Sequence, residues 1–191
     1  TQHGEIRTRF SIFGIILRMQ KIERVTLKNG LDVNFLFDKK FTTSSVQMCF
    51  KIGWRNDNVD HLGLAHLFEH LVGKRTKKYP GKSEFAKKLD EMGIVTNAFT
   101  GPDTTVYYHN QIHKNLLSSL SMLFEAVYNT EFLEEDLEKE KHVVMNESRE
   151  YLDNDDAIIW RQAMMNLYPG TSLEKYFFGD ETTMKNITLT V

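Results

Sequence analysis

Residues 63–70 read GLAHLFEH and contain the pattern H-x-x-E-H at His66, Glu69 and His70. If this stretch is helical, His66 and His70 lie one turn apart on the same face. Two imidazoles in that arrangement can bind a single metal ion, while Glu69 adjoins the same face and can reach a metal-bound water without being a ligand. The order of the residues inverts the commoner H-E-x-x-H motif of zinc peptidases. The stretch therefore predicts a helix that provides two ligands of one zinc ion per chain.

Two histidines leave one protein ligand missing, and a later acidic stretch can supply it. Glu140 and Glu147 are seven residues apart, which is two helical turns, so both lie on one face of a helix. Val143, Val144 and Met145 accompany them, so this stretch is expected to be packed, where a carboxylate needs a partner such as a metal ion. The residues alone do not choose between Glu140 and Glu147, and either carboxylate taken by itself would suit a solvated helix face.

The composition is that of a globular protein without a basic footprint for nucleic acid. The chain has 191 residues, of which 41% are hydrophobic, and a net charge of −2 at pH 7. Its size suits one domain, and no nucleic-acid partner is expected because basic residues are not in excess. Two short charged runs are expected to be solvated surface: Lys74, Arg75, Lys77 and Lys78, and then Glu134, Glu135, Asp136 and Glu138.

The single cysteine and the N-terminal segment bear on the compartment. Cys49 cannot form an intrachain disulfide, and its apolar neighbours predict a buried thiol in a reducing compartment, which favours a cytoplasmic location. The run from Ile12 to Leu17 is too short to span a membrane. Flanking arginines give it some likeness to a targeting segment, so an organellar address stays open. We expect residues 1–18 to be an extension and residues 19–191 to be the folded domain.

Hydrophobic periodicity and turn residues predict the elements. Strands are expected at residues 22–27, 31–37, 46–52, 94–100 and 105–109, and helices at 62–72, 83–92, 113–128, 130–151 and 157–167. Asn29-Gly30 between the first two strands is a strong hairpin signal. Ser83 and Thr130 are candidate helix caps, and Gly93 is a candidate helix stop. Early strands with long helices between and after them predict an α+β fold, in which a mostly antiparallel sheet packs against helices.

In these residues the chain resembles the pitrilysin/insulinase family of metallopeptidases, which includes the mitochondrial processing peptidases. GLAHLFEH is similar to the glycine-led zinc helix of that family, whose third ligand is a glutamate roughly seventy-odd residues later. Here 76 residues, 71 to 146, lie between His70 and Glu147. The resemblance implies that His66, His70 and Glu147 bind zinc. It also implies that Glu69 is the general base and then the general acid, and that Glu140 supports the site without being a ligand.

A second match is a segment made of Asn97, Ala98, Phe99 and Thr100, followed by Asp103, Thr104 and Tyr107. It resembles the strand of the same family that lies beside the zinc and pairs with the bound substrate. An edge strand can do this by offering main-chain hydrogen bonds to an extended peptide. By itself, the segment would equally suit an ordinary strand and turn.

The resemblance runs from about residue 25 to the C-terminus and departs from the family after the second histidine. Gly73 and Arg75 stand before Thr76, where the family usually has a phenylalanine and then a glycine. Altered local packing is expected there, with the zinc ligands unaffected.

Together these features predict a zinc endopeptidase that hydrolyses peptides or unfolded protein segments. The alternative is a non-catalytic peptide-binding or structural subunit of the same fold that acts with a partner chain, although family members of that kind have usually lost ligand residues. Family members pair such a domain with a second one of similar fold, for which 191 residues leave no room. We therefore expect the domain to be incomplete at its C-terminus and to work with a second homologous domain or a partner subunit.

Overall fold

The structure, a computed structural model, describes residues 22–81 and 83–191. The chain divides into two units, Thr1–Thr42 and Thr43–Val191. The extension predicted at residues 1–18 lies outside the described residues. No helix in the part that is described has both the length and the apolar character needed to cross a membrane.

The described part of the first unit is a hairpin. β1 (Ile22–Thr26) pairs antiparallel with β2 (Asp32–Leu36). In the connection between them Gly30 takes a φ of +87°, and the Asn29 side chain accepts a hydrogen bond from the Leu31 N–H at 3.2 Å. A left-handed glycine after asparagine is what the Asn-Gly signal supplies, and the predicted hairpin is confirmed.

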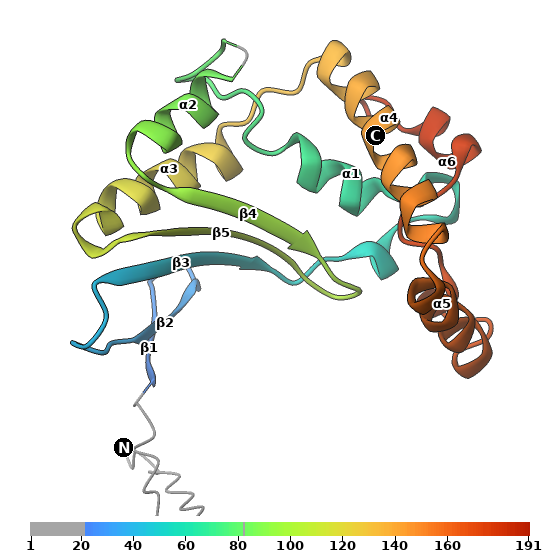
Figure 1. Cartoon of the computed structure of the whole chain (residues 1–191), viewed down its shortest axis with the longest axis horizontal. Coiled ribbons are helices and arrows are strands. Elements are labelled where there is room, and N and C mark those ends of the chain that lie inside the picture. The colour runs from blue at the N-terminus through green and yellow to red at the C-terminus, as the bar shows by residue number, and fades with distance from the viewer. Residues whose placement is uncertain (1–21, 82) are drawn as a thin grey trace, which may run out of the picture. The chain divides into compact units, whose positions relative to one another are not determined.

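The second unit contains a three-stranded antiparallel sheet in the order β3-β5-β4. β3 (Thr43–Phe50) and β4 (Val95–Thr100) flank β5 (Thr105–Ile112), as Figure 1 shows. β5 is the most buried strand because it has a neighbour on both sides. Within the described residues β4 pairs only with β5, so it is an edge strand of this sheet.

The two faces of β3 differ in exposure. Val46, Met48 and Phe50 are half-buried, whereas Cys49 is exposed. Successive side chains of a strand point to opposite faces, so the apolar neighbours of Cys49 lie on the other side of the sheet from its thiol. The predicted buried thiol is wrong for this reason.

The helices in the described residues are α1 (Leu64–Leu71), α2 (Glu84–Glu91), α3 (Leu116–Tyr128), α4 (Glu134–Leu152), α5 (Asp155–Leu167) and α6 (Glu181–Asn186). Short 3₁₀ turns lie at Trp54–Asn56, Val59–His61, His113–Asn115 and Ser172–Glu174. Figure 1 shows α1, α2 and α3 on the same side of the sheet. The arrangement is the predicted α+β fold, with helices packed against an antiparallel sheet.

The ends of α2 follow the prediction in part. Ser83 precedes the helix, but its side chain makes no capping hydrogen bond. Gly93 has a φ of +63° just beyond the last turn, which is the left-handed conformation that glycine favours at a helix end. The predicted stop at Gly93 is confirmed, and the predicted side-chain cap at Ser83 is not.

The start of α4 was predicted wrongly. The helix begins at Glu134, four residues after the expected cap Thr130. The Thr130 hydroxyl instead donates to the Ala126 carbonyl at the end of α3 and accepts from the Gly73 N–H at 2.9 Å. The residue therefore joins α3 to the segment after α1 rather than capping α4.

Two buried apolar clusters among the described residues hold the helices together. In the first, Leu67 and Leu71 of α1 share one core with Leu137 and Val144 of α4, closed by Phe178, Met184 and Ile187. In the second, Phe85 and Leu89 of α2 pack with Ile94, Met122 and Ala126. Fully burying such a side chain contributes about 1.5–3 kcal/mol, so the first cluster is a main source of the attraction between α1 and α4.

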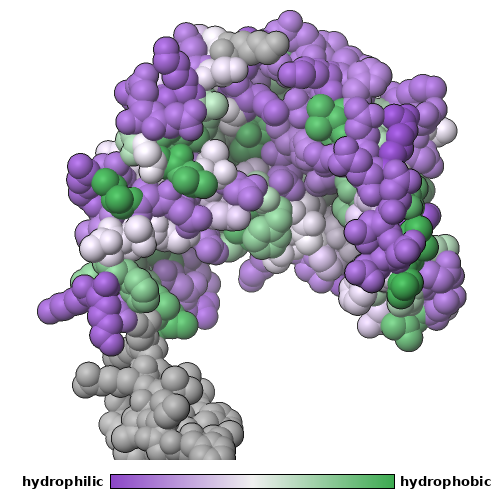
Figure 2. All heavy atoms as spheres, viewed as in Figure 1, coloured by the Kyte–Doolittle hydropathy of each residue, from purple (hydrophilic) through white to green (hydrophobic). Residues whose placement is uncertain are grey.

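The helix α5 carries an apolar surface. Figure 2 shows a mostly hydrophilic exterior with hydrophobic side chains in several places, one of which is α5 on the lower right. The exposed large side chains of this helix are Ile158, Ile159, Trp160 and Leu167. Several large exposed apolar side chains on one helix suit a surface that another protein segment covers.

Candidate metal centre

The helix that carries the H-x-x-E-H pattern begins after a glycine, at a position where the surroundings leave no room for a side chain. Gly63 precedes α1 with a φ of +89°, and a Cβ there would lie 2.4 Å from the carbonyl oxygen of Phe178. No side chain at the N-cap satisfies the first N–H groups of the helix. The Asp57 carboxylate does so instead, accepting from Gly63 N–H at 3.0 Å and from Ala65 N–H at 3.1 Å. Asp57 thus fixes the start of α1.

Packing of α1 against α4 brings three of the predicted ligands together. His66 Nε2 lies 3.8 Å and His70 Nε2 lies 3.4 Å from Glu147 Oε2. One ligand atom of each residue lies within 4.8 Å of the others, and the described residues contain no second group of this kind. The two imidazoles stand one turn apart on α1, as the spacing predicted, with ring centroids 4.7 Å apart.

Glu140 lies on the other side of the His70 ring. Its Oε2 is 3.4 Å from His70 Nδ1, and its Oε1 is 3.0 Å from Lys74 Nζ. Only 3% of Glu140 is exposed. The geometry therefore groups Glu147 with the Nε2 atoms of the two histidines and places Glu140 behind one of them, which is the usual position of a carboxylate that orients a ligating histidine.

The donor set fits zinc on the chemistry of its atoms. Burial and, to a smaller extent, the neighbouring His70 together lower the pKa of His66 to about 4. His66 is therefore neutral at pH 7, the form in which imidazole binds a metal. Two imidazole nitrogens and one carboxylate oxygen match a catalytic zinc site that keeps its fourth position open.

Glu69 lies beside this group and touches the sheet. Its Oε2 accepts a hydrogen bond from Thr100 Oγ1, the last residue of β4, at 2.6 Å. Burial raises the pKa of Glu69, so its carboxylate is a stronger base than an ordinary glutamate. The contact joins the H-x-x-E-H helix directly to the predicted substrate strand.

The four residues of that strand lie along β4. Asn97 and Phe99 are exposed, with 52% of Phe99 accessible, while Ala98 and Thr100 are half-buried. The Ala98 N–H donates to its neighbour Asn97 Oδ1 at 2.8 Å. Of the predicted substrate residues, Thr100 is the one that the structure joins to Glu69, and the others occupy the edge strand leading to it.

Sequence reasoning missed several residues around the centre. Arg75 and Asp136 were expected to be solvated, yet the side chain of each is only 14% exposed, and the two pair with each other at 2.6 Å. Tyr107 was part of a matched segment without a role, and its hydroxyl is buried without a hydrogen-bond partner. Burial and the nearby Glu69 raise the pKa of Tyr107. The burial of these three side chains depends on packing between distant segments of the chain, so no local sequence pattern indicated it.

Solved structures share this fold. A protease from Helicobacter pylori has a TM-score of 0.81 and 31% identity, covering 90% of this chain and 41% of that one. Pitrilysin has a TM-score of 0.77 at 23% identity, covering 94% of this chain and 18% of its own. The second likeness concerns the fold alone.

Curated relatives point the same way. A Rickettsia felis protein named "uncharacterized zinc protease" is 31% identical over 163 residues, which are 85% of this chain and 39% of the relative. The beta subunit of the mitochondrial-processing peptidase of Bos taurus is 27% identical over 173 residues, 91% of this chain and 35% of the subunit. The chain thus spans less than half the length of these relatives. The model of the insulinase family, peptidase family M16, matches residues 35–181, and the chain belongs to this family of peptidases.

Proposed function

We propose that this chain is the zinc-binding, catalytic part of an endopeptidase that cuts peptides or unfolded protein segments. His66, His70 and Glu147 would hold one zinc ion, and Glu69 would move the protons. The observation that carries the proposal is the grouping of three donor atoms within 4.8 Å on two packed helices. Family membership and the name of the Rickettsia felis relative support it.

Each residue has a role that its contacts suit. Bound zinc would polarise the substrate carbonyl and lower the pKa of a water molecule. Glu69 takes the proton of the attacking water and later delivers it to the leaving amide nitrogen. The hydrogen bond from Thr100 to Oε2 orients the Glu69 carboxylate for this exchange. Glu140 holds the ring of His70 through Nδ1.

The edge strand β4 would align the substrate. An extended peptide added beside Asn97, Ala98, Phe99 and Thr100 would form main-chain hydrogen bonds with the side of β4 that faces away from β5. Thr100 ends this strand and touches Glu69. A peptide held there would run toward the Glu69 carboxylate. Its scissile bond would then be positioned by main-chain pairing with β4 rather than by a single side-chain pocket.

The working enzyme would include more protein than this chain. The relatives are more than twice as long as the part matched here, and α5 exposes a hydrophobic surface. A second homologous domain or a partner subunit would form the other wall of the site and exclude water from it. The cytoplasmic location expected from the sequence stays a prediction.

Glu69→Gln in the complete protein tests the proposal. The variant is expected to keep its zinc and to lose about 100-fold or more in kcat, because it keeps the shape of the side chain but cannot accept a proton. Metal analysis and hydrolysis of an internally quenched peptide give the two readouts. Glu91→Gln, an exposed glutamate on α2, is the control and should change neither. Unchanged hydrolysis in the Glu69 variant would contradict the proposed role.

A further inference from the structure

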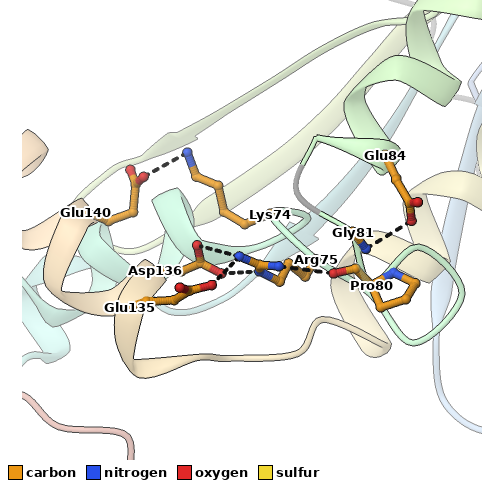
Figure 3. Close-up of polar contacts among 8 residues, drawn as sticks. All are labelled: Lys74, Arg75, Pro80, Gly81, Glu84, Glu135, Asp136 and Glu140. Carbon is orange, nitrogen blue, oxygen red and sulfur yellow. Dashed lines mark hydrogen bonds and ion pairs between the residues drawn. The ribbon is translucent and has the colours of Figure 1, made fainter.

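The segment after α1 forms ion pairs with the first turns of α4. Lys74 and Arg75 are consecutive residues of the connection between α1 and α2, and they reach Glu140 and Asp136 (Figure 3). We call these four residues the clasp. Asp136 and Glu140 are four positions apart on α4, so they stand one turn apart on the same face. The clasp therefore holds two successive turns of α4 against the end of the H-x-x-E-H helix.

The arginine of the clasp anchors the start of α4. Its Nε donates to Asp136 Oδ2 at 2.6 Å, and its guanidinium also pairs with Glu135. A further bond goes from Nη1 to the Pro80 carbonyl at 3.2 Å. A planar guanidinium that makes bonds in several directions fixes orientation as well as distance. Arg75 stands at the position where the sequence departs from the glycine of the resembling family.

The lysine of the clasp holds a buried carboxylate. Oε1 of Glu140 lies 3.0 Å from Lys74 Nζ, and Oε2 lies 3.4 Å from His70 Nδ1. The Glu140 side chain is 4% exposed, while that of Lys74 is 44% exposed, so the ammonium reaches in from the surface. A carboxylate buried with too few partners is costly, which makes Lys74 a main determinant of how Glu140 is oriented.

The orientation of Glu140 decides which ring nitrogen of His70 has a free lone pair for a metal ion. A carboxylate oxygen only accepts, so this contact is a hydrogen bond when His70 Nδ1 carries the proton, and it favours that tautomer. His70 Nε2 then keeps its lone pair on the side where Glu147 lies 3.4 Å away. Apolar packing holds α1 against α4, but it does not specify how Glu140 and His70 are oriented, because hydrophobic contact is non-directional.

We propose that Lys74 is a positioning residue of the metal centre, which acts through Glu140 to hold His70 in the tautomer that presents Nε2 to the ion. The inference rests on the proposed zinc site and adds a residue to it. The remaining clasp pair, Arg75 and Asp136, fixes α4 along its axis so that Glu140 stays within reach of Lys74.

Lys74→Met tests the proposal, since methionine keeps most of the apolar stem and removes the ammonium. In the complete protein, chelator competition should show zinc affinity reduced by about tenfold, the low end of the effect of outer partners of a metal ligand. Lys74→Arg should recover most of the loss. The matched control is Lys88→Met on α2, because Lys88 is 43% exposed and also lies 3.0 Å from a glutamate, Glu91. Its zinc affinity should equal that of the wild type.

Two further readouts separate positioning from general destabilisation. With Glu140→Gln already present, Lys74→Met should change zinc affinity by less than about twofold, because coupled residues are non-additive. In zinc-free protein at pH 8, the ¹⁵N spectrum of His70 should show the proton on Nδ1 in the wild type and a mixture of tautomers in Lys74→Met. An unchanged tautomer, or an equal loss of affinity in the Glu140→Gln background, would overturn the proposal. Wild-type protein that binds no zinc at His66 and His70 would overturn the proposed function instead, and the tautomer would still decide the role of Lys74.

Discussion

At the scale of single residues, Asp57 links the loop before α1 to the start of the helix that carries His66 and His70. It accepts from the Gly63 and Ala65 N–H groups, so it satisfies donors that every helix start leaves unpaired. Lys175 lies nearby and donates to the Asp57 carbonyl. Burial raises the pKa of the Asp57 carboxyl to about 6, and the hydrogen bonds only partly offset that rise.

This pKa gives a pH dependence whose sign follows from linkage. The folded state of the protein binds the Asp57 proton more readily than the unfolded state, whose aspartate pKa is about 3.9. The contribution of Asp57 to stability is therefore greatest below pH 4 and falls as pH rises toward about 6. The free energy of unfolding of the wild type minus that of Asp57→Asn should decrease over this window and level off above it. Urea unfolding at several pH values measures the difference, and a difference that rises with pH would contradict the assignment.

The sequence predicted the residues of the centre better than their partners. His66, Glu69 and His70 could be placed because the helical repeat alone puts them on one face. The contacts of Asp57 with Gly63, Thr100 with Glu69, and Lys74 with Glu140 could not be predicted. They depend on how a loop or strand packs on a helix, and the residue types involved are common on solvated surfaces.

At the scale of elements, the strands and helices were predicted to within a few residues where local signals were strong. The hairpin at Asn29-Gly30 and the stop at Gly93 rest on glycine in the left-handed conformation, which a sequence shows directly. The start of α4 was missed because the Thr130 hydroxyl bonds back to α3. Hydroxyl residues suit caps and such local bonds equally, so the sequence alone does not distinguish the two uses.

The edge strand β4 makes a prediction that separates substrate pairing from folding. Ala98 N–H donates to the Asn97 side chain rather than to β5, and in an antiparallel ladder the next residue, Phe99, directs its N–H to the opposite side. Ala98→Pro should therefore raise KM for an extended peptide by about tenfold, the effect of roughly one lost hydrogen bond, with zinc content unchanged.

The matched control is Phe99→Pro, which removes a donor that faces β5. It should lower the melting temperature more than Ala98→Pro does. Steady-state kinetics and thermal unfolding of the two variants give the comparison. If a stably folded Ala98→Pro enzyme kept the wild-type KM, β4 would be an ordinary structural strand.

At the scale of the whole molecule, the metal centre described here is one wall of a proposed active site. The chain spans 39% of the Rickettsia felis relative and 35% of the bovine peptidase subunit. Catalysis benefits when a substrate is held in a fixed geometry away from bulk water. A protein that supplied the opposite wall would provide that environment, and the exposed apolar side chains of α5 suit a covered surface.

Residues 1–191 alone are accordingly expected to bind zinc and to cleave peptides poorly. Their kcat/KM should be at least about 100-fold below that of the complete protein, since effective concentration and water exclusion are lost. Peptide hydrolysis by the 191-residue chain and by the complete protein, with zinc content matched, measures this ratio. Equal kcat/KM from a monomeric 191-residue chain would show that no second wall is needed.

In the proposed site, one zinc ion is held by His66, His70 and Glu147, with Glu140 outside the coordination sphere. Anomalous diffraction at the zinc edge from crystals of the zinc-loaded protein tests it most directly. A single peak is expected at about 2.0–2.2 Å from one imidazole nitrogen of each histidine and from the Glu147 carboxylate. A peak bound by Glu140 in place of Glu147, or zinc located away from the two histidines, would contradict it.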